Sequence, residues 1–266
     1  MWGSVDRITM LVYGESGSGK TTFVGTFPGK ILWLVCSGGN RPEELKSIDT
    51  PANRKRIRPV VIDSTDKFRE EVERAADGRY DTVVLDHVTG FSDLVIKELL
   101  GLDRVPVSKA KAAGKGESWS LVSQQQYGQL AVIAKEAFRD MLNLPGNVVF
   151  IAQERAFNVK DDGGVDVLKP TVGAALTPSL AGWLNPACSY VGQMFKRPRM
   201  EEKVREGTNG KQVVTLVRGR GVEYCLRTEP HDVYMTKFRR PGGKDLPEVI
   251  VNPTYDKVKA LIDGEE

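Results

Sequence analysis

A glycine-rich stretch near the N-terminus has the residue types needed to hold a chain of phosphates. Its spacing, from Gly14 through Gly19 and Lys20 to Thr21, satisfies the pattern GxxxxGK[ST]. Glycines let successive backbone N–H groups turn inward toward a phosphate, at the positive end of the helix expected to follow. Lys20 can reach the β- and γ-phosphate oxygens, and the Thr21 hydroxyl can ligate Mg²⁺. We therefore predict a site for a nucleoside triphosphate, ATP with Mg²⁺. The predicted nucleotide-binding residues are Gly14, Glu15, Ser16, Gly17, Ser18, Gly19, Lys20, Thr21 and Thr22.

A carboxylate at the end of a later apolar run could serve the same metal ion. Residues 82–85 are apolar after Thr82 and are followed directly by Asp86. A carboxylate at the end of such a strand supports Mg²⁺ through its water shell in many triphosphate-binding proteins. We therefore predict that Asp86 acts with Lys20 and Thr21 and lies beside the first strand. His87, the next residue, is predicted to be structural.

Other kinds of chemistry find no support in the sequence. There is no His/Cys cluster with zinc-ligand spacing, no Gly-x-Ser-x-Gly segment and no Asn-Lys-x-Asp segment of the kind that reads guanine. A small-molecule kinase would be expected to carry an arginine-rich lid. The comparable stretch, residues 103–118, contains lysines and only one arginine, Arg104.

The elements that must position these residues alternate along the chain. Continuous apolar runs predict buried parallel strands, and amphipathic stretches between them predict helices. This alternation predicts an α/β fold with a mostly parallel central sheet and helices on both faces. The predicted strands are residues 8–13, 31–36, 82–85 and 148–152, and the predicted helices are residues 20–26, 65–76, 91–100 and about 123–142.

The second half of the chain has a different pattern. Residues 213–217 and 222–226 flank Arg-Gly-Arg-Gly at 218–221 and predict a β-hairpin with its turn there. An amphipathic helix is predicted at residues 255–262, and residues 103–118 and 158–173 are predicted to be loops. We expect a single domain over residues 1–266, with a core of about 5–195 and the hairpin, a late strand and the helix in about 196–266.

Bulk composition places the chain among ordinary globular proteins. It has 266 residues, a net charge of +3, 40% hydrophobic and 27% charged residues. There is no apolar run of about 18 residues and no leader segment, and three widely spaced cysteines suit a reducing compartment. We therefore expect a cytoplasmic protein without a membrane partner. Residues 196–220 hold eight basic against three acidic side chains, a local excess that could attract phosphate backbones or be a solvated surface.

Taken together, these features resemble the RecA-like ATPases, in particular phage-encoded RecA-like proteins that act in single-strand annealing or recombination. The strand at 147–152 ends in Gln153, and the resemblance implies that this residue senses the γ-phosphate. It also implies that the loops at 103–118 and after Glu154 bind single-stranded DNA. A phage origin would place the protein in the cytoplasm of a bacterial host. The DNA-binding candidates are Lys109, Lys111, Lys115, Arg155, Lys160 and Lys169.

The same resemblance implies self-association into a ring or filament. Lys237 and Arg239, with Arg240 beside them, look like the paired basic residues that reach a neighbouring subunit's γ-phosphate. The chain departs from the RecA-like pattern at one point. RecA-like enzymes usually carry a glutamate just after the second strand that orients the attacking water, and this chain has Ser37-Gly38-Gly39 there. Either Glu43 or the adjacent Glu44 takes the place of that glutamate, or Glu154 does so, or hydrolysis is slow.

The resulting hypothesis is an ATP-binding and ATP-hydrolysing protein that binds single-stranded DNA and promotes annealing or recombination. Two alternatives remain open. One is a small-molecule or nucleotide kinase with a lysine-rich lid over its substrate. The other is a non-enzymatic interaction module switched by nucleotide.

Overall fold

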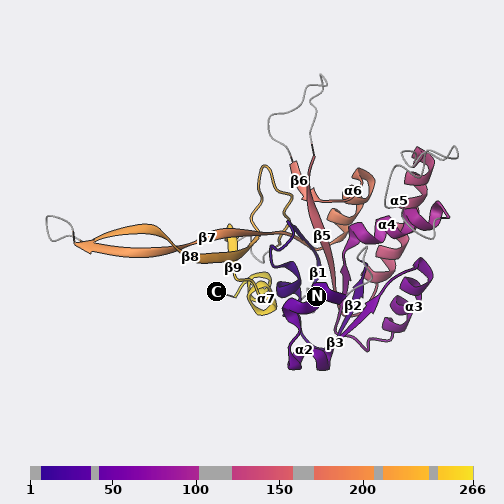
Figure 1. Cartoon of the computed structure of the whole chain (residues 1–266), viewed down its shortest axis with the longest axis horizontal. Coiled ribbons are helices and arrows are strands. Elements are labelled where there is room, and N and C mark those ends of the chain that lie inside the picture. The colour runs from indigo at the N-terminus through magenta and orange to yellow at the C-terminus, as the bar shows by residue number, and fades with distance from the viewer. Residues whose placement is uncertain are drawn as a thin grey trace, which may run out of the picture.

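The computed structural model describes residues 7–36, 42–101, 122–157, 171–206, 212–239 and 245–265. Its centre is a sheet with the strand order β3-β2-β4-β5-β1-β7-β8-β9, to which β6 is added as a partner of β5 (Figure 1). The strands are β1 Thr9–Gly14, β2 Ile31–Val35, β3 Ile57–Val61, β4 Thr82–Asp86, β5 Asn147–Phe157, β6 Thr171–Ala174, β7 Tyr190–Glu206, β8 Gln212–Arg227 and β9 Val249–Val251.

Helices cover both faces of this sheet. The helical elements are α1 Lys20–Val24, the 3-10 helix η1 Pro42–Ile48, α2 Pro51–Arg56, α3 Thr65–Ala75, α4 Val88–Leu99, α5 Gln124–Leu142, α6 Pro178–Ala187 and α7 Tyr255–Asp263. One apolar cluster joins the sheet to α3, α4, α5 and α6, and a second joins its other face to α1, η1 and α7. The strands from β3 to β7 in this order pair in parallel. The inner strands β1, β2 and β4 are mostly apolar and buried along their whole length, because helices cover both faces of the sheet there. The predicted fold class is confirmed.

Local sequence signals explain where several helices begin. The Ser64 side chain accepts a hydrogen bond from Lys67 N, and Thr254 does the same for Lys257 N. Ser123 and Gln126 form a reciprocal capping box at the start of α5. These caps satisfy backbone N–H groups that a helix cannot pair internally, and they fix helix starts within a few residues of the predicted ones.

The position predicted for Asp86 is wrong in one respect. Its strand β4 does not lie beside β1, because β5 is inserted between them. In the register of these strands Asp86 is level with Ile151, and Gly14 is level with Gln153. The carboxyl ends of β4, β5 and β1 therefore form one edge, on which Gln153 stands between Asp86 and the glycine-rich loop.

The predicted β-hairpin extension is present as the antiparallel pair β7 and β8, but the predicted position of its turn, at residues 218–221, is wrong. Both of its proposed strands belong to the single strand β8, whose antiparallel partner is β7. Gly221 has a φ of +91° and lies where the register shifts between Pro198 and Met200. The Arg-Gly-Arg-Gly segment thus forms an irregularity within a long strand and not a turn, because glycine permits a bulge as readily as a reversal.

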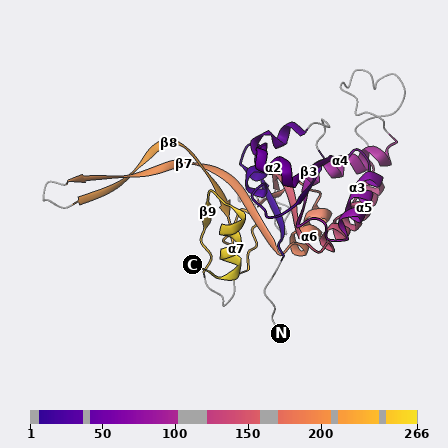
Figure 2. The same cartoon turned by 90° about the horizontal axis from the view of Figure 1, so that it is seen from below.

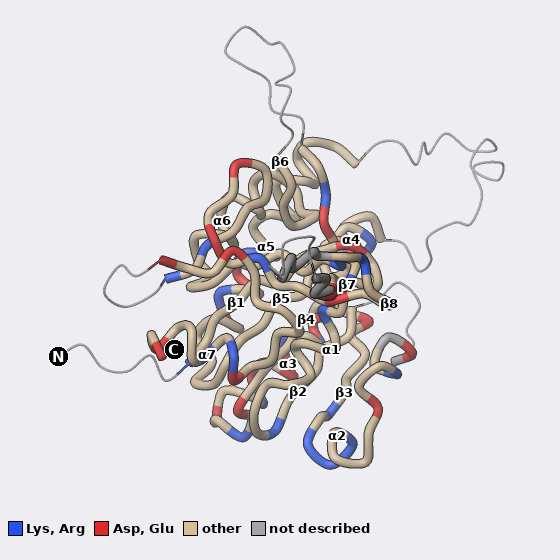
Figure 3. Tube along the Cα trace, turned by 90° about the vertical axis from the view of Figure 1, so that its left-hand side faces the viewer, with Lys and Arg blue, Asp and Glu red and all other residues tan. Residues whose placement is uncertain are grey.

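Beyond Met194, β7 leaves β1 and continues with β8 alone as a projecting two-stranded ribbon (Figures 1 and 2). We call residues 195–206 and 212–224 the arm. At about 3.3 Å per residue, its twelve residues on β7 reach roughly 40 Å. Figure 3 views the molecule from the side to which the arm points and shows basic and acidic residues interspersed along the trace.

The long strand β7 was not predicted from the sequence, and neither were the shorter strands β6 and β3. β6 begins at Thr171, inside the segment predicted to be a loop up to Gly173. β3 forms an edge of the sheet and contains Pro59, which an edge strand tolerates because one side of its ladder is unpaired. Alternation of apolar residues is weak in β6 and β3, so periodicity did not reveal them.

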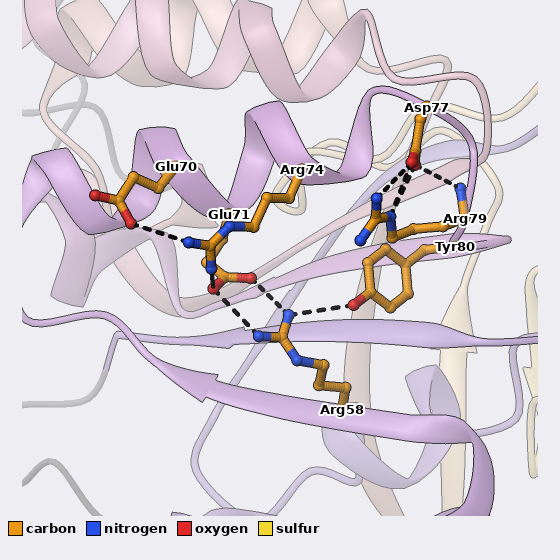
Figure 4. Close-up of polar contacts among 7 residues, drawn as sticks. All are labelled: Arg58, Glu70, Glu71, Arg74, Asp77, Arg79 and Tyr80. Carbon is orange, nitrogen blue, oxygen red and sulfur yellow. Dashed lines mark hydrogen bonds and ion pairs between the residues drawn. The ribbon is translucent and has the colours of Figure 1, made fainter.

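An ion-pair network fastens β3 to α3 (Figure 4). Arg58 donates to both carboxylate oxygens of Glu71, at 2.6 and 3.2 Å, and to the Tyr80 hydroxyl at 3.1 Å. Arg74 donates to the same carboxylate at 2.8 Å. Glu71 is only 4% exposed, and the hydrogen bond from Arg58 is the main reason why its pKa lies below the usual value. Glu71 can be both buried and ionised because two arginines pair with its charge.

Among the described helices, none is long and apolar enough to cross a membrane.

Candidate functional site

A cavity of about 610 Å³ lies at the edge where β1, β4 and β5 end. Open α/β sheets bind ligands at this edge because loops there are free to carry polar groups. The lining comes from seven parts of the chain that are separated in sequence. The lining residues are 16–23, Thr26, Ser47, Asp86, His87, 151–153, Met194, Tyr224 and 252–254.

The glycine-rich loop connects β1 to α1 and forms one wall of this cavity. Gly17 and Gly19 have φ values of +71° and +89°, a conformation that side chains with a Cβ adopt only at a cost. Gly19 is the N-cap of α1 and provides no side-chain cap. The first N–H groups of the helix are therefore left for an anion from outside the chain.

Two further features show that the loop fits a phosphate ligand. Ser18 is 1% exposed, and its hydroxyl has no hydrogen-bond partner among the described residues. A buried hydroxyl without a partner is costly, and a phosphate oxygen would satisfy it. Gly14 packs so closely on β7 that a Cβ would lie 2.1 Å from the Met194 carbonyl oxygen. The loop is thereby held against the sheet by backbone contact.

Lys20 lies folded over this loop. Its ammonium donates to the carbonyl oxygens of Gly14 and Glu15, at 2.8 and 2.7 Å. Burial lowers the pKa of Lys20, and the negative charges of Asp86, Glu154 and Glu15 oppose that shift. A lysine with neutral carbonyl partners can exchange them for phosphate oxygens, which bind an ammonium more strongly.

Asp86 is buried at the floor of the cavity, 4% exposed. The indole N–H of Trp33, on the neighbouring strand β2, donates to its carboxylate at 3.1 Å. Within the described ranges no group of three or more His, Cys, Asp and Glu side chains could hold a metal unaided. This fits Mg²⁺, which is held by one or two protein ligands together with water and substrate phosphates. Asp86 and Thr21 are the residues that would hold it, and the ion would neutralise charge on the phosphates.

His87 has a structural role, as predicted, although it lines the cavity. It is the N-cap of α4, and its Nδ1 accepts a hydrogen bond from Gly90 N at 2.9 Å. Burial, followed by the nearby charge of Lys20, lowers its pKa. A neutral imidazole is the form that can accept this hydrogen bond.

The end of β5 brings Gln153 and Glu154 to the same edge. Gln153 is exposed and lines the cavity. Glu154 accepts a hydrogen bond from Gln193 on β7 at 3.2 Å, and Gln193 in turn accepts one from Arg227 at 3.3 Å. Because Gln193 is buried and both ends of its amide are engaged, the orientation of the Glu154 carboxylate is restricted. Neither Glu43, which is exposed on η1, nor Glu154 is among the residues that line the cavity.

The predicted DNA-binding residues fall mostly outside the described residues. This holds for Lys109, Lys111, Lys115, Lys160 and Lys169. Arg155 is described: it is exposed on β5, two residues beyond Gln153, with its guanidinium 5.7 Å from the centre of the Phe157 ring.

The two basic residues predicted to reach a neighbouring subunit, Lys237 and Arg239, have different surroundings in the structure. Lys237 donates to the carbonyl oxygens of Asn185, Pro186 and Cys188, where α6 ends, at 3.3, 2.9 and 2.5 Å. Its ammonium thus caps a helix of its own chain. Arg239 is exposed and makes no hydrogen bond or ion pair with a described residue. Arg240 lies outside the described residues.

The cavity also contains residues that sequence reasoning did not find. Tyr224 comes from β8, and the segment from Asn252 to Thr254 follows β9. The sequence Asn252-Pro253 indicated the start of a helix but gave no sign of a site. No local signal could have found Tyr224, since only the pairing of β8 with β7 brings it to the loop.

Comparisons with solved structures give matches of low identity. A KaiC-like protein from the hyperthermophilic archaeon Pyrococcus horikoshii OT3 is 11% identical, with 92% of this chain and 89% of that chain covered and a TM-score of 0.39. The RadB recombinase is 15% identical, with 83% and 87% covered and a TM-score of 0.36. The comparison with curated proteins gives no match.

The family comparison is more informative. A family model described as the AAA domain matches residues 6–240. The matched region contains the glycine-rich loop, Asp86 and Gln153, and it covers well over half of the chain. The chain therefore belongs to the AAA domain family and is a P-loop ATPase.

Proposed function

We propose that this ATPase binds single-stranded DNA under the control of its nucleotide and promotes strand annealing or recombination. The observation that carries the proposal is the course of β5. This strand runs from the nucleotide cavity, at Ile151 to Gln153, directly to the exposed Arg155. It continues toward residues 158–170, a segment that carries Lys160 and Lys169.

The local pairing supports a mechanical link along this strand. The carbonyl of Gln153 accepts a hydrogen bond from Ala175 N at 2.7 Å, and Glu154 to Phe157 pair with β6. A rotation of the Gln153 side chain toward a γ-phosphate would therefore act on a short two-stranded segment. Sequence-independent DNA binding needs only cations that meet phosphates, and Arg155 on this segment is an exposed cation.

We further propose self-association, in which Arg239 reaches the nucleotide of a neighbouring copy. Its exposed guanidinium without a partner among the described residues supports this role, and the capping role of Lys237 leaves Arg239 as the better candidate. Mixing Arg239→Ala with Lys20→Ala tests it. A trans-acting arginine predicts that the mixture regains ATPase activity that neither variant has alone. Failure to regain it in mixed assemblies contradicts the role.

We also propose that the chain forms a single domain and acts in a reducing compartment. Tyr255 N donates to Thr26 Oγ1 at 2.8 Å, and the Tyr255 and Phe27 rings lie 5.1 Å apart. The C-terminal helix α7 thus packs on α1 in the same core. The three cysteines are buried and free, which suits the cytoplasm.

The decisive experiment is ATPase activity with and without single-stranded DNA, at low and high salt. We expect stimulation that weakens as salt rises. Gln153→Ala should keep basal turnover and lose most of the stimulation, and Arg155→Ala should require more DNA for it. Arg69→Ala, an exposed arginine on α3, is the matched control and should behave as the wild type.

Other outcomes would favour the alternatives. Transfer of phosphate to an added small-molecule acceptor, without an effect of DNA, would favour the kinase. Its lysine-rich lid, residues 103–118, lies outside the described residues. Nucleotide-dependent partner binding with no turnover would favour the switched module.

A further inference from the structure

The root of the arm lies directly against the glycine-rich loop. Gly14 is level with Met194 in the pairing of β1 with β7, so the arm leaves the sheet beside the loop (Figures 1 and 2). A Cβ on Gly17 would lie 3.7 Å from the ammonium nitrogen of Lys196. A Cβ on Gly19 would lie 2.8 Å from the ring of Tyr224. Two glycines of the loop thus each face one residue of the arm.

These two arm residues belong to the same face of the ribbon. Lys196 and Tyr224 are directly opposite each other in the antiparallel register, and directly opposed residues of a ladder point to the same side. Arg197 and Glu223, the next pair, point to the other side and form an ion pair at 3.0 Å. The face turned to the loop therefore presents a cation and an aromatic ring side by side.

We propose that the arm root clamps the bound nucleotide in cis: Lys196 contacts the phosphates, and the Tyr224 ring packs on the nucleoside. The proposal rests on the nucleotide-binding part of the proposed function and is independent of DNA. Tyr224 lies against Gly19 and lines the cavity, and Lys196 lies beside Gly17, so both side chains border the loop that would hold the triphosphate.

Lys196 is available for this role. Its side chain is exposed and makes no hydrogen bond or ion pair with any described residue. Besides Lys20, the lysine predicted to contact a nucleotide phosphate was Lys237. Its ammonium is instead held by three carbonyl oxygens at the end of α6. Lys196 is on a flexible four-carbon stem next to a loop that concentrates negative charge when phosphate is bound.

Tyr224 is held in place by the segment after β9. Asn252 N donates to the Tyr224 carbonyl at 2.6 Å, and Tyr224 N donates to the Asn252 side-chain oxygen at 3.4 Å. Asn252 adopts a φ of +46°, which turns the chain so that Pro253 and Thr254 also line the cavity. Tyr224 nevertheless remains 40% exposed, which leaves surface on which a nucleoside can pack.

The test measures the binding of ATP and of inorganic tripolyphosphate, each with Mg²⁺, to purified full-length protein. Lys196→Ala should weaken both ligands by a similar factor of about ten, because it removes a charge-assisted contact to phosphate. Tyr224→Ala should weaken ATP about tenfold and leave tripolyphosphate unchanged, because it removes only packing on the nucleoside. Tyr224→Phe should retain ATP binding. Arg197→Ala, on the opposite face, is the control.

Two results would overturn the clamp. One is that Lys196→Ala binds both ligands as tightly as Arg197→Ala does. The other is that Tyr224→Ala loses tripolyphosphate as strongly as ATP, which would mean that the ring supports the loop and does not contact the nucleoside.

A mixing experiment decides between action in cis and in trans. Adding Lys20→Ala to Lys196→Ala should leave the ATP concentration for half-maximal activity as high as for Lys196→Ala alone, because a cis clamp needs both lysines in one chain. Recovery would show that Lys196 serves a neighbour's site. Absence of DNA stimulation in the wild type would refute the proposed function and leave these binding results unaffected.

Discussion

Replacing Trp33 by phenylalanine tests whether the indole positions the magnesium-supporting carboxylate. Trp33 is fully buried, and its N–H donates to Asp86 at 3.1 Å. Losing a buried hydrogen bond to a charged group costs about 2 kcal/mol, and the smaller ring forfeits about 1 kcal/mol of packing. With a urea slope of about 3 kcal/mol per molar, the midpoint of unfolding should fall by about 1 M.

The same variant should also impair use of the metal. Partners that orient metal-supporting groups typically contribute 10–100-fold in affinity. The Mg²⁺ concentration for half-maximal ATPase activity should therefore rise about tenfold in Trp33→Phe. Trp183→Phe is the matched control, because Trp183 is a partly buried tryptophan of α6 that does not line the cavity. If both variants unfold at the same urea concentration and require the same Mg²⁺, the positioning role of Trp33 is refuted.

Three further predictions follow from single contacts. Lys20→Ala should abolish ATP binding and turnover with unchanged circular dichroism; turnover at the wild-type rate would show that the site is misassigned. Gly14→Ala should greatly reduce soluble, folded protein, because its Cβ would meet the Met194 carbonyl oxygen at 2.1 Å; a thermal midpoint equal to the wild type would contradict this. The pKa of Glu71 is lower in the folded than in the unfolded protein, chiefly because Arg58 hydrogen-bonds its carboxylate. The ionised Glu71 therefore stabilises the fold above about pH 4.3, and this contribution is lost as the pH falls through the folded-state pKa. Unfolding free energies of Glu71→Gln and wild type should therefore converge in acid, and a constant gap from pH 7 to pH 3 would contradict the assignment.

Most of the sheet could be predicted because its strands carry their signal within a few residues. The runs that became β1, β2 and β4 are apolar throughout, as strands buried on both faces must be. β3 and β6 lacked this signal, since an edge strand and a short partner strand are only partly buried. The predicted turn in β8 failed for a related reason, because glycines at 219 and 221 are compatible with a bulge as well as with a reversal.

The sequence by itself determined the phosphate loop, because its chemistry depends on backbone geometry within eight consecutive residues. It also pointed to Asp86 through the carboxylate at the end of an apolar strand, and the resemblance to RecA-like ATPases implied Gln153. Only the tertiary structure decided the remainder of the site. It placed β5 between β4 and β1, brought Trp33 to Asp86, engaged Lys237 at the end of α6, and set Lys196 and Tyr224 against the loop. These contacts join residues that are tens to hundreds of positions apart, and they arise from strand register and packing that no local pattern encodes.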